Sequence, residues 1–269
     1  MLERRTSVAG ALASVVASAY HRLRRSRAGP LMLRAIDRAA GGRAAVPATV
    51  RAGPLVGMTL ELDPRVQADV VIGAYERHAS DVIRRSLQAG DTAFDVGSHF
   101  GYFALLMSAS VAPGGRVICF EPDREVFATL ERNVARNARI VGTDVTAVNM
   151  AIAGSAGARR FARGGHTSRG SLSDVGEVEV SAITLDDAVA RHGVPALVKI
   201  DVEGGELQVL DGGSELLRAG STVFVIETHS AALLDACRAR LRSHGYDVVE
   251  LSERGRAETY VVATPRSAG

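Results

Sequence analysis

The sequence predicts an α/β protein with a doubly wound, mostly parallel seven-stranded sheet and an N-terminal helical extension. Two observations carry this prediction. The run 92–96 is short and apolar, breaks into a turn at Gly97 and Gly101, and gives way to a helical apolar rhythm. A second apolar run, 116–120, ends in the acid Glu121. Strand, glycine turn and helix in this order are typical of the ligand-binding edge of such a sheet.

Residues 1–54 are interpreted as a basic extension and linker ahead of one domain spanning 55–269. Up to residue 51 the chain holds ten arginines against two acids. The stretch 7–20 predicts a helix with an apolar face that runs into a basic cluster at 22–27, and 41–54 is interpreted as a loop. Such a helix can lie on a membrane surface, contact a partner or form a solvated cap, and we favour the cap. It is too short to span a bilayer.

The stretch 55–62 alternates and predicts the strands of a small hairpin, ended by Asp63-Pro64. A helix is expected from Arg77 to Leu87. Just before it, Tyr75 and Glu76 have two open interpretations. They either reach a cofactor pocket from above, or they form an ordinary helix N-terminus with an acid in its first turn.

The remaining elements follow the same alternation of strand and helix. An amphipathic helix is expected over 123–137 with Asp123 as its N-cap, and another helix over 233–241. The further predicted strands are 144–152, 196–200, 222–226, and 247–251 with 259–263 as an antiparallel pair. Between two strand-like runs, 159–162 and 178–183, lies a loop rich in Gly, Ser and Arg. Long loops are often functional, so we interpret it as a hairpin that covers a substrate, with disorder as the alternative.

The glycine turn predicts a nucleoside site. Glu121 lies about as far downstream as the ribose-binding carboxylate of dinucleotide folds, for which the rule is roughly 20 residues. The glycines do not follow G-x-G-x-x-G, the pattern that places a pyrophosphate on a helix N-terminus. A single-glycine turn between Asp95 and Glu121 suits a cationic ligand with a ribose and no phosphate. S-adenosylmethionine (SAM) is such a ligand, and Ala151 falls where its adenine would lie.

Three predicted strands deliver Asp95, Asp201 and Glu227 to one edge of the sheet. Unpaired buried acids are costly, so this grouping indicates chemistry. His229 follows a strand end and has a near-neutral reference pKa, which makes it a candidate general base. Asp201 is the alternative, as a base or as an anchor for an acceptor hydroxyl. A divalent metal on Asp201 and Glu227 is a third option. No third ligand is visible, so we assign no metal residues.

Taken in order, these motifs resemble the FkbM-type SAM-dependent methyltransferases, over roughly 75–263. The motifs are Asp95–Tyr102, Phe120–Pro122, Lys199–Glu206 and Ile226-Glu227, with Gly73–Glu76 and Thr184–Asp187 in the same pattern. The resemblance implies a Rossmann-like class I methyltransferase fold with a SAM pocket at Asp95–Gly101 and Glu121. It also implies O-methylation of a hydroxyl on a sugar, polyketide or other secondary metabolite. The proposed cofactor-binding residues are Tyr75, Glu76, Asp95, Gly97, Gly101, Glu121 and Ala151, and the catalytic ones are His229 and Asp201.

Two other functions stay open: an NAD(P)-dependent oxidoreductase, disfavoured by the missing phosphate-cradling glycines, and a SAM-binding protein without catalysis.

The composition limits the size of the core, the kinds of partner and the location. With 269 residues, 46% apolar, and a net charge of +2, the chain predicts a sizeable core and no polyanion such as nucleic acid as partner. Two cysteines are too few for a disulfide framework, so a cytoplasmic location is expected. The small-molecule hydroxyl acceptor is what the family resemblance implies. Lys199, the only lysine, is interpreted as a coding bias toward arginine.

Overall fold

The computed structural model describes residues 45–63, 66–163, 170–252 and 259–266. The chain forms two compact units. The first comprises Met1–Arg77 and Arg132–Ile140, and the second comprises His78–Glu131 and Val141–Gly269. The predicted N-terminal helix at 7–20 and the basic cluster at 22–27 lie outside the described residues.

The first unit holds an antiparallel hairpin of β1 (Val46–Thr49) and β2 (Thr59–Leu62), followed by the short helix α3 (Ala68–Val71). A hairpin was predicted, but its first strand was wrongly placed. Residues 46–49 form a strand where a linker was expected, and 54–57 form the turn. The reason is local: Gly53 and Gly57 take φ of 80° and 89°, which breaks an extended run.

Two asparagines in the same unit continue the pairing of β2. Asn137 Oδ1 accepts from the Thr59 amide at 3.0 Å, and Asn133 Oδ1 accepts from the Glu61 amide at 2.6 Å. Their Nδ2 groups donate back to the carbonyls of the same two strand residues. A side-chain amide has the donor and acceptor of a peptide group, so it satisfies strand groups that lack a neighbouring strand.

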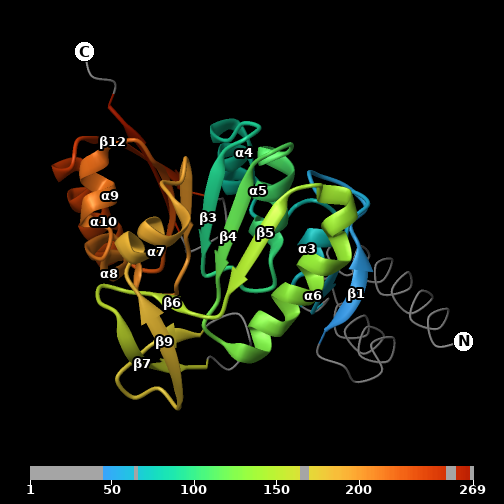
Figure 1. The fold of residues 1–269 in the computed structure, drawn as a ribbon, viewed down its shortest axis with the longest axis horizontal. Helices are drawn as coiled ribbons and strands as arrows, with labels where there is room; N and C mark the ends of the chain where they lie inside the picture. Colours follow the sequence, from blue (N-terminus) through green and yellow to red (C-terminus); the bar gives the residue numbers. More distant parts are fainter. Residues whose placement is uncertain (1–44, 64–65, 164–169, 253–258, 267–269) are drawn as a thin grey trace, which may run out of the picture. The chain divides into compact units, whose positions relative to one another are not determined.

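The second unit contains the seven-stranded sheet, in the order β12-β13-β11-β10-β3-β4-β5 (Figure 1). Its strands are β3 (Thr92–Val96), β4 (Arg116–Phe120), β5 (Asp144–Val148), β10 (Leu197–Ile200), β11 (Val223–Thr228), β12 (Tyr246–Ser252) and β13 (Thr259–Pro265). The first five are parallel, and β13 is antiparallel to β11 and to β12. The predicted doubly wound sheet is therefore confirmed, and its winding reverses between β3 and β10, where ligands of such sheets bind.

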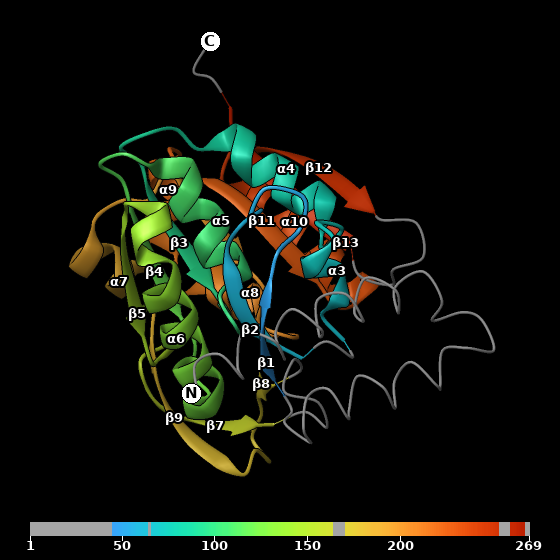
Figure 2. The same cartoon turned by 90° about the vertical axis from the view of Figure 1, so that its right-hand side faces the viewer.

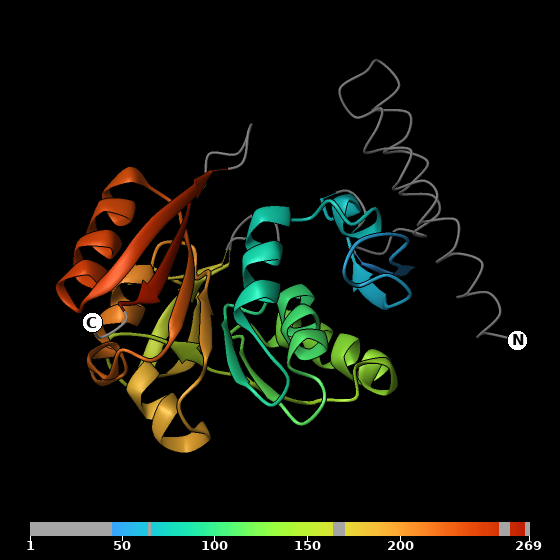
Figure 3. The same cartoon turned by 90° about the horizontal axis from the view of Figure 1, so that it is seen from above.

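Helices cover both faces of this sheet. They are α4 (Arg77–Ser86), α5 (Tyr102–Val111), α6 (Arg124–Val141), α7 (Leu185–His192), α8 (Glu206–Asp211), α9 (Ser214–Ala219) and α10 (Ala231–Ser243). On one face the side chains of Phe94, Val198 and Phe224 pack with residues of α7 to α10. On the other face α5 lies across β3 and β4 (Figures 2 and 3). Within the described part of the chain, no helix is both long and apolar enough to cross a membrane.

The predicted third strand, 144–152, splits in two. After β5, Asn149 turns the chain by donating from Nδ2 to the carbonyls of Glu121 and Pro122 at 2.8 and 3.0 Å. β6 (Ala151–Ile152) then joins a separate four-stranded sheet with β9 (Val178–Ile183), β7 (Gly157–Ala162) and β8 (Ser171–Leu172). The antiparallel pairing of β7 with β9 confirms that the two predicted strands pair, whereas the covering of a substrate stays a prediction. Residues 164–169 lie outside the described part of the chain.

The C-terminal antiparallel pair is also confirmed. β11 extends two residues beyond the predicted end at Ile226, because Glu227 and Thr228 pair with Tyr260 and Thr259 of β13. Glu227 therefore lies within the sheet, and only His229 follows its end.

The end of β3 is packed against the end of β10. Gly97 has a φ of 81°, and a Cβ at this position would collide with the carbonyl oxygen of Asp201. Gly90 has a nearly equal φ of 90° but open space around the corresponding position. Substitution of Gly90 therefore measures the cost of backbone strain alone, whereas substitution of Gly97 adds the cost of overpacking.

We expect Gly90→Ala to lower the free energy of unfolding by about 1–2 kcal/mol, the cost of a left-handed backbone. Gly97→Ala should cost about 1–3 kcal/mol more, because the β3 and β10 ends must move apart. Urea unfolding of the two variants and wild type measures the difference. Equal losses of unfolding free energy in the two variants would show that the Asp201 backbone moves away from a Cβ at no cost.

Candidate active site

Parallel register brings the predicted site residues to one level. Ile200 pairs with Val96, and Val96 pairs with Phe120 across the next strand. The residues that follow are Asp201, Gly97 and Glu121, so these three lie side by side where their strands end. The structure therefore gathers them as the sequence predicted.

Glu121 is buried and held by two backbone amides. Its Oε2 accepts from the His99 amide at 3.0 Å, and its Oε1 accepts from the Asp123 amide at 2.9 Å. His99 provides its amide from a turn with a φ of 49°, unusual for a residue with a side chain. Each carboxylate oxygen has a further lone pair. Glu121 thus fits two neighbouring hydroxyl donors, such as those of a ribose.

Burial strongly changes the acidity of this carboxyl group. Desolvation, reinforced by the carboxylates of Asp123 and Asp95, raises the pKa of Glu121 to about 7, although the two amide hydrogen bonds act in the opposite direction. A carboxyl group with this pKa changes its charge close to neutral pH. Hydrogen bonding by Glu121 to a ligand is consequently sensitive to pH in that range.

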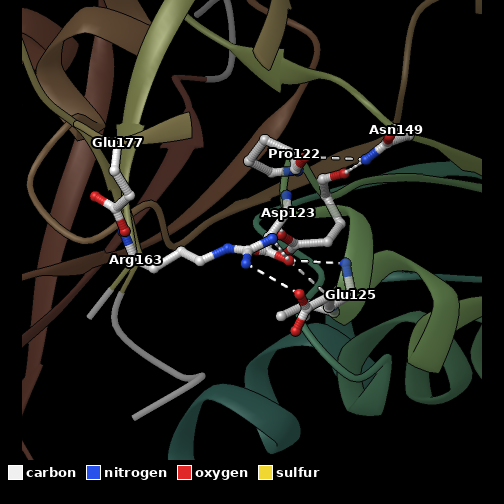
Figure 4. A network of polar contacts seen from close by, with 8 residues as sticks. Pro122, Asp123, Glu125, Asn149, Arg163 and Glu177 are labelled. Atoms are coloured by element: carbon white, nitrogen blue, oxygen red, sulfur yellow. Dashed lines mark hydrogen bonds and ion pairs between the residues drawn. The ribbon is translucent and has the colours of Figure 1, made fainter. Parts of the chain in front are cut away.

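The segment after Glu121 is tied to the small sheet by an ionic network (Figure 4). Asp123 caps α6 as predicted, because its Oδ1 accepts from the Glu125 amide at 2.8 Å. Arg163, at the end of the described part of the β7 side of the hairpin, donates to Asp123 at 2.6 Å and to Glu125 at 3.0 Å. Its own amide donates to Glu177 at 2.9 Å. Sequence reasoning missed this arginine, since nothing in a polar loop marks which arginine finds a partner.

Lys199 is the most informative residue that the sequence interpretation misjudged. Its side chain is 3% exposed, and its Nζ lies 3.0 Å from Asp201 Oδ2 and 4.0 Å from Asp95 Oδ1. The ammonium group also lies 4.7 Å from the ring centroid of Phe103 in α5. A single lysine inside an apolar strand was a visible signal, because a charge buried there needs a partner.

The other predicted cofactor residues have packing roles of their own. Asp95 is buried within β3 and faces Lys199. A Cβ on Gly101 would lie 2.7 Å from Leu130 Cδ1, and Ala151 packs with Phe161 and Val180 in the small sheet.

Tyr75 and Glu76 belong to the first unit, immediately before α4, and Glu76 is buried there with a φ of 40°. Cofactor binding by all these residues remains a prediction.

His229 meets three carboxylates. We call Asp201, Glu203, Glu206 and His229 the acid–histidine cluster. The Nδ1 of His229 lies 2.8 Å from Glu206 Oε1, and its Nε2 lies 3.3 Å from Glu203 Oε2 and 3.6 Å from Asp201 Oδ1. The predicted pair Asp201 and His229 is thus brought together, whereas the roles of Glu203 and Glu206 were not foreseen.

Charge sets the acidity of this cluster. Burial alone would lower the pKa of His229, but the hydrogen bond to Glu206 and the carboxylates of Asp201 and Glu203 raise it to about 9. Burial would raise the pKa of Asp201, but Lys199 and His229 hold it below its ordinary value. In the free protein at neutral pH, His229 is therefore a cation beside the ionised Asp201.

Glu227 does not join the cluster, which corrects the predicted pairing with Asp201 as metal ligands. Its Oε2 accepts from the buried Tyr260 hydroxyl at 2.7 Å. The ligand-type atoms that converge belong to Asp201, Glu203 and His229. The difference follows from the length of β11, which keeps Glu227 inside the sheet.

The strand order, together with the glycine turn after β3 and the acid after β4, defines a class I SAM-dependent methyltransferase fold. More particularly, the chain belongs to the FkbM methyltransferase family, because residues 95–248 match the methyltransferase FkbM domain. SAM is the cofactor that this family and fold imply.

Two relatives and one solved structure illustrate the likeness. Hexuronic acid methyltransferase AglP of Haloferax volcanii is 30% identical over 193 residues, 69% of this chain and 77% of that protein. Methyltransferase sdnD of Sordaria araneosa is 26% identical over 218 residues, 67% of this chain and 81% of that protein. The crystal structure of methyltransferase FkbM from Methylobacillus flagellatus KT matches with a TM-score of 0.53 at 17% identity. That match covers 65% of this chain and 43% of the other, and it shows the shared fold.

SAM affinity should fall as the pH falls through about 7. If ribose hydroxyls donate to ionised Glu121, binding uses only the ionised fraction, which is about tenfold smaller at pH 6 than at pH 8. Calorimetric titration with SAM between these pH values should show a comparable loss. Glu121→Gln should bind more weakly and lose most of this pH dependence. A wild-type profile that stays flat would contradict ribose binding by Glu121.

Proposed function

We propose that this protein transfers a methyl group from SAM to a hydroxyl oxygen of a small-molecule acceptor, a sugar or another secondary metabolite. The observation that supports the proposal is that Asp201 and His229 lie 3.6 Å apart next to the strand ends where we expect SAM to bind. The name of the AglP relative includes a hexuronic acid, and this supports a sugar-type acceptor.

The residues present fit SAM. When bound, SAM supplies an electrophilic methyl group, and the protein must align the acceptor oxygen with it and remove a proton. The Glu121 carboxylate offers acceptor lone pairs for the ribose hydroxyls, and its strand-end position fits that role. Gly97 and Gly101 form the turn beside it, after Asp95 of β3, and we propose that the methionine part of SAM lies there. Ala151 is the proposed adenine neighbour, and Tyr75 and Glu76 remain candidate cofactor-binding residues.

Asp201 and His229 are the proposed proton-handling pair. Lys199 fixes Asp201 through Oδ2, so its Oδ1 is the oxygen nearer to His229 Nε2. An acceptor hydroxyl seated there can donate to the Asp201 carboxylate. The imidazole can accept the proton at Nε2 only in its neutral form. His229 can therefore act as the base only if another cation replaces its own positive charge among the carboxylates. Otherwise Asp201 must take the proton.

Binding and chemistry should separate in variants. His229→Ala and Asp201→Asn should keep SAM affinity but lower methyl transfer by about 10²- to 10⁴-fold, the range of a general base. His244→Ala is the matched control, because His244 ends α10, and it should turn over normally. The measurement is methyl transfer from labelled SAM to a panel of sugars, uronic acids and hydroxylated metabolites.

Two results would sink the proposal. Wild-type turnover in both site variants would place the chemistry elsewhere. Transfer to no hydroxyl of the panel, by a protein that binds SAM, would count against a hydroxyl acceptor.

A further inference from the structure

We propose that Asp201, Glu203 and His229 bind a divalent transition-metal cation. The existence of this site stands on the geometry of the cluster. Its role, holding an oxygen of the acceptor, rests on the proposed function. This set of ligands differs from the Asp201–Glu227 pair that the sequence suggested, because it includes an imidazole and a third ligand.

Spacing is the first argument. One ligand atom from each of Asp201, Glu203 and His229 can be chosen so that all lie within 4.8 Å of one another. The two measured separations from His229 Nε2 are 3.3 Å to Glu203 and 3.6 Å to Asp201. A cation with bonds of about 2.0–2.2 Å places neighbouring ligand atoms roughly 3–3.6 Å apart. The side chains need only small movements to reach such a cation.

The orientation of His229 is the second argument. Glu206 is fully buried, and its Oε1 lies 2.8 Å from Nδ1. A carboxylate on one ring nitrogen fixes the tautomer that offers the other nitrogen to a metal. The free lone pair of a neutral ring would then be on Nε2, the nitrogen that faces Asp201 and Glu203. Glu206 is thus placed as the orienting partner of a metal-binding histidine.

Charge is the third argument. Three carboxylates surround one histidine, and Lys199 lies on Asp201 at 3.0 Å. The second oxygen of Glu206, Oε2, is buried and has no hydrogen-bond partner among the described residues. Carboxylates at such spacing repel one another, and the one of Glu206 is also buried away from water. A divalent cation would offset this negative charge more fully than one proton on His229.

The backbone is the fourth argument. Glu203 has a φ of 55° and is followed by Gly204 with a φ of 112°. Residues with side chains take this conformation at a cost, and such strain gathers at ligand-binding sites. Here the turn brings Glu203 beside His229 within three residues of the end of β10. A structural turn alone would accept glycine at this position without the strain.

The ligand set favours some cations over others. Imidazole nitrogen suits Zn²⁺, Fe²⁺ and, together with carboxylates, Mn²⁺, whereas Ca²⁺ prefers oxygen ligands alone. Three protein ligands leave coordination positions for an acceptor that offers one or two oxygens. A metal-bound hydroxyl would be more acidic. With Nε2 of His229 on the cation, His229 would hold the metal and the hydroxyl proton would pass to the Asp201 carboxylate.

Direct binding of Mn²⁺ to the full chain tests the site without relying on activity. The chelator-treated protein is titrated with Mn²⁺, and free Mn²⁺ is followed by electron paramagnetic resonance. We expect one saturable equivalent that Zn²⁺ displaces. Glu203→Gln and His229→Gln should weaken Mn²⁺ binding by at least about tenfold, and Glu206→Gln by about 10- to 100-fold. The controls His244→Gln and Glu177→Gln, outside the cluster, should bind as wild type. SAM affinity of each variant shows that it is folded.

Every outcome decides the proposal. No saturable binding of Mn²⁺ or Zn²⁺, or equal binding by wild type, Glu203→Gln and His229→Gln, would overturn it and leave an ion-pair network with protonated His229. Methyl transfer that proceeds fully in chelator would refute the metal's role but leave the proposed function standing. One bound equivalent of Mn²⁺ without methyl transfer to any hydroxyl would confirm the metal site but refute the proposed function.

Discussion

The ion pair between the buried Lys199 ammonium and the partly exposed Asp201 carboxylate holds the carboxyl edge of the sheet together. A lone charge inside a sheet is costly, so Lys199 needs a carboxylate partner there. Lys199 lies between Asp95 of β3 and Asp201 after β10, at the place where the winding reverses, and beneath the Phe103 ring. It thereby fixes one oxygen of Asp201, so the other points toward His229. The position of the proposed chemistry follows from a single ammonium group.

Buried carboxylates elsewhere at the carboxyl ends of the strands also have specific partners. Backbone amides hold Glu121, the Tyr260 hydroxyl holds Glu227, and Arg163 with the α6 N-terminus holds Asp123. The contact of Arg163 with Asp123 connects the segment after β4 to the small β6–β9 sheet by charge. The acid–histidine cluster is the exception, since it gathers more negative charge than its described partners balance.

Much of the fold could be predicted because the spacing of apolar residues indicates its strands and helices. The strand–turn–helix at Gly97, the acid after β4 and the N-cap at Asp123 follow from spacing alone, and the motif resemblance fixed the family. The remainder depends on tertiary contacts. The position of β1 depends on glycines with positive φ. The break after β5 depends on the hydrogen bonds of the Asn149 side chain. Glu227 belongs to β11 because it pairs with β13. Arg163 and Glu206 matter through partners that are distant in the sequence, Asp123 and His229, and no residue pattern displays such pairs.

The central claim is that one edge of the sheet holds the cofactor by Glu121 and performs chemistry beside Asp201 and His229. A crystal structure with S-adenosylhomocysteine, the demethylated cofactor, tests this most directly. The account predicts both ribose hydroxyls on the Glu121 carboxylate and the cofactor sulfur facing the space next to Asp201 and His229. A ribose bound away from Glu121, or a sulfur facing away from Asp201, would contradict it.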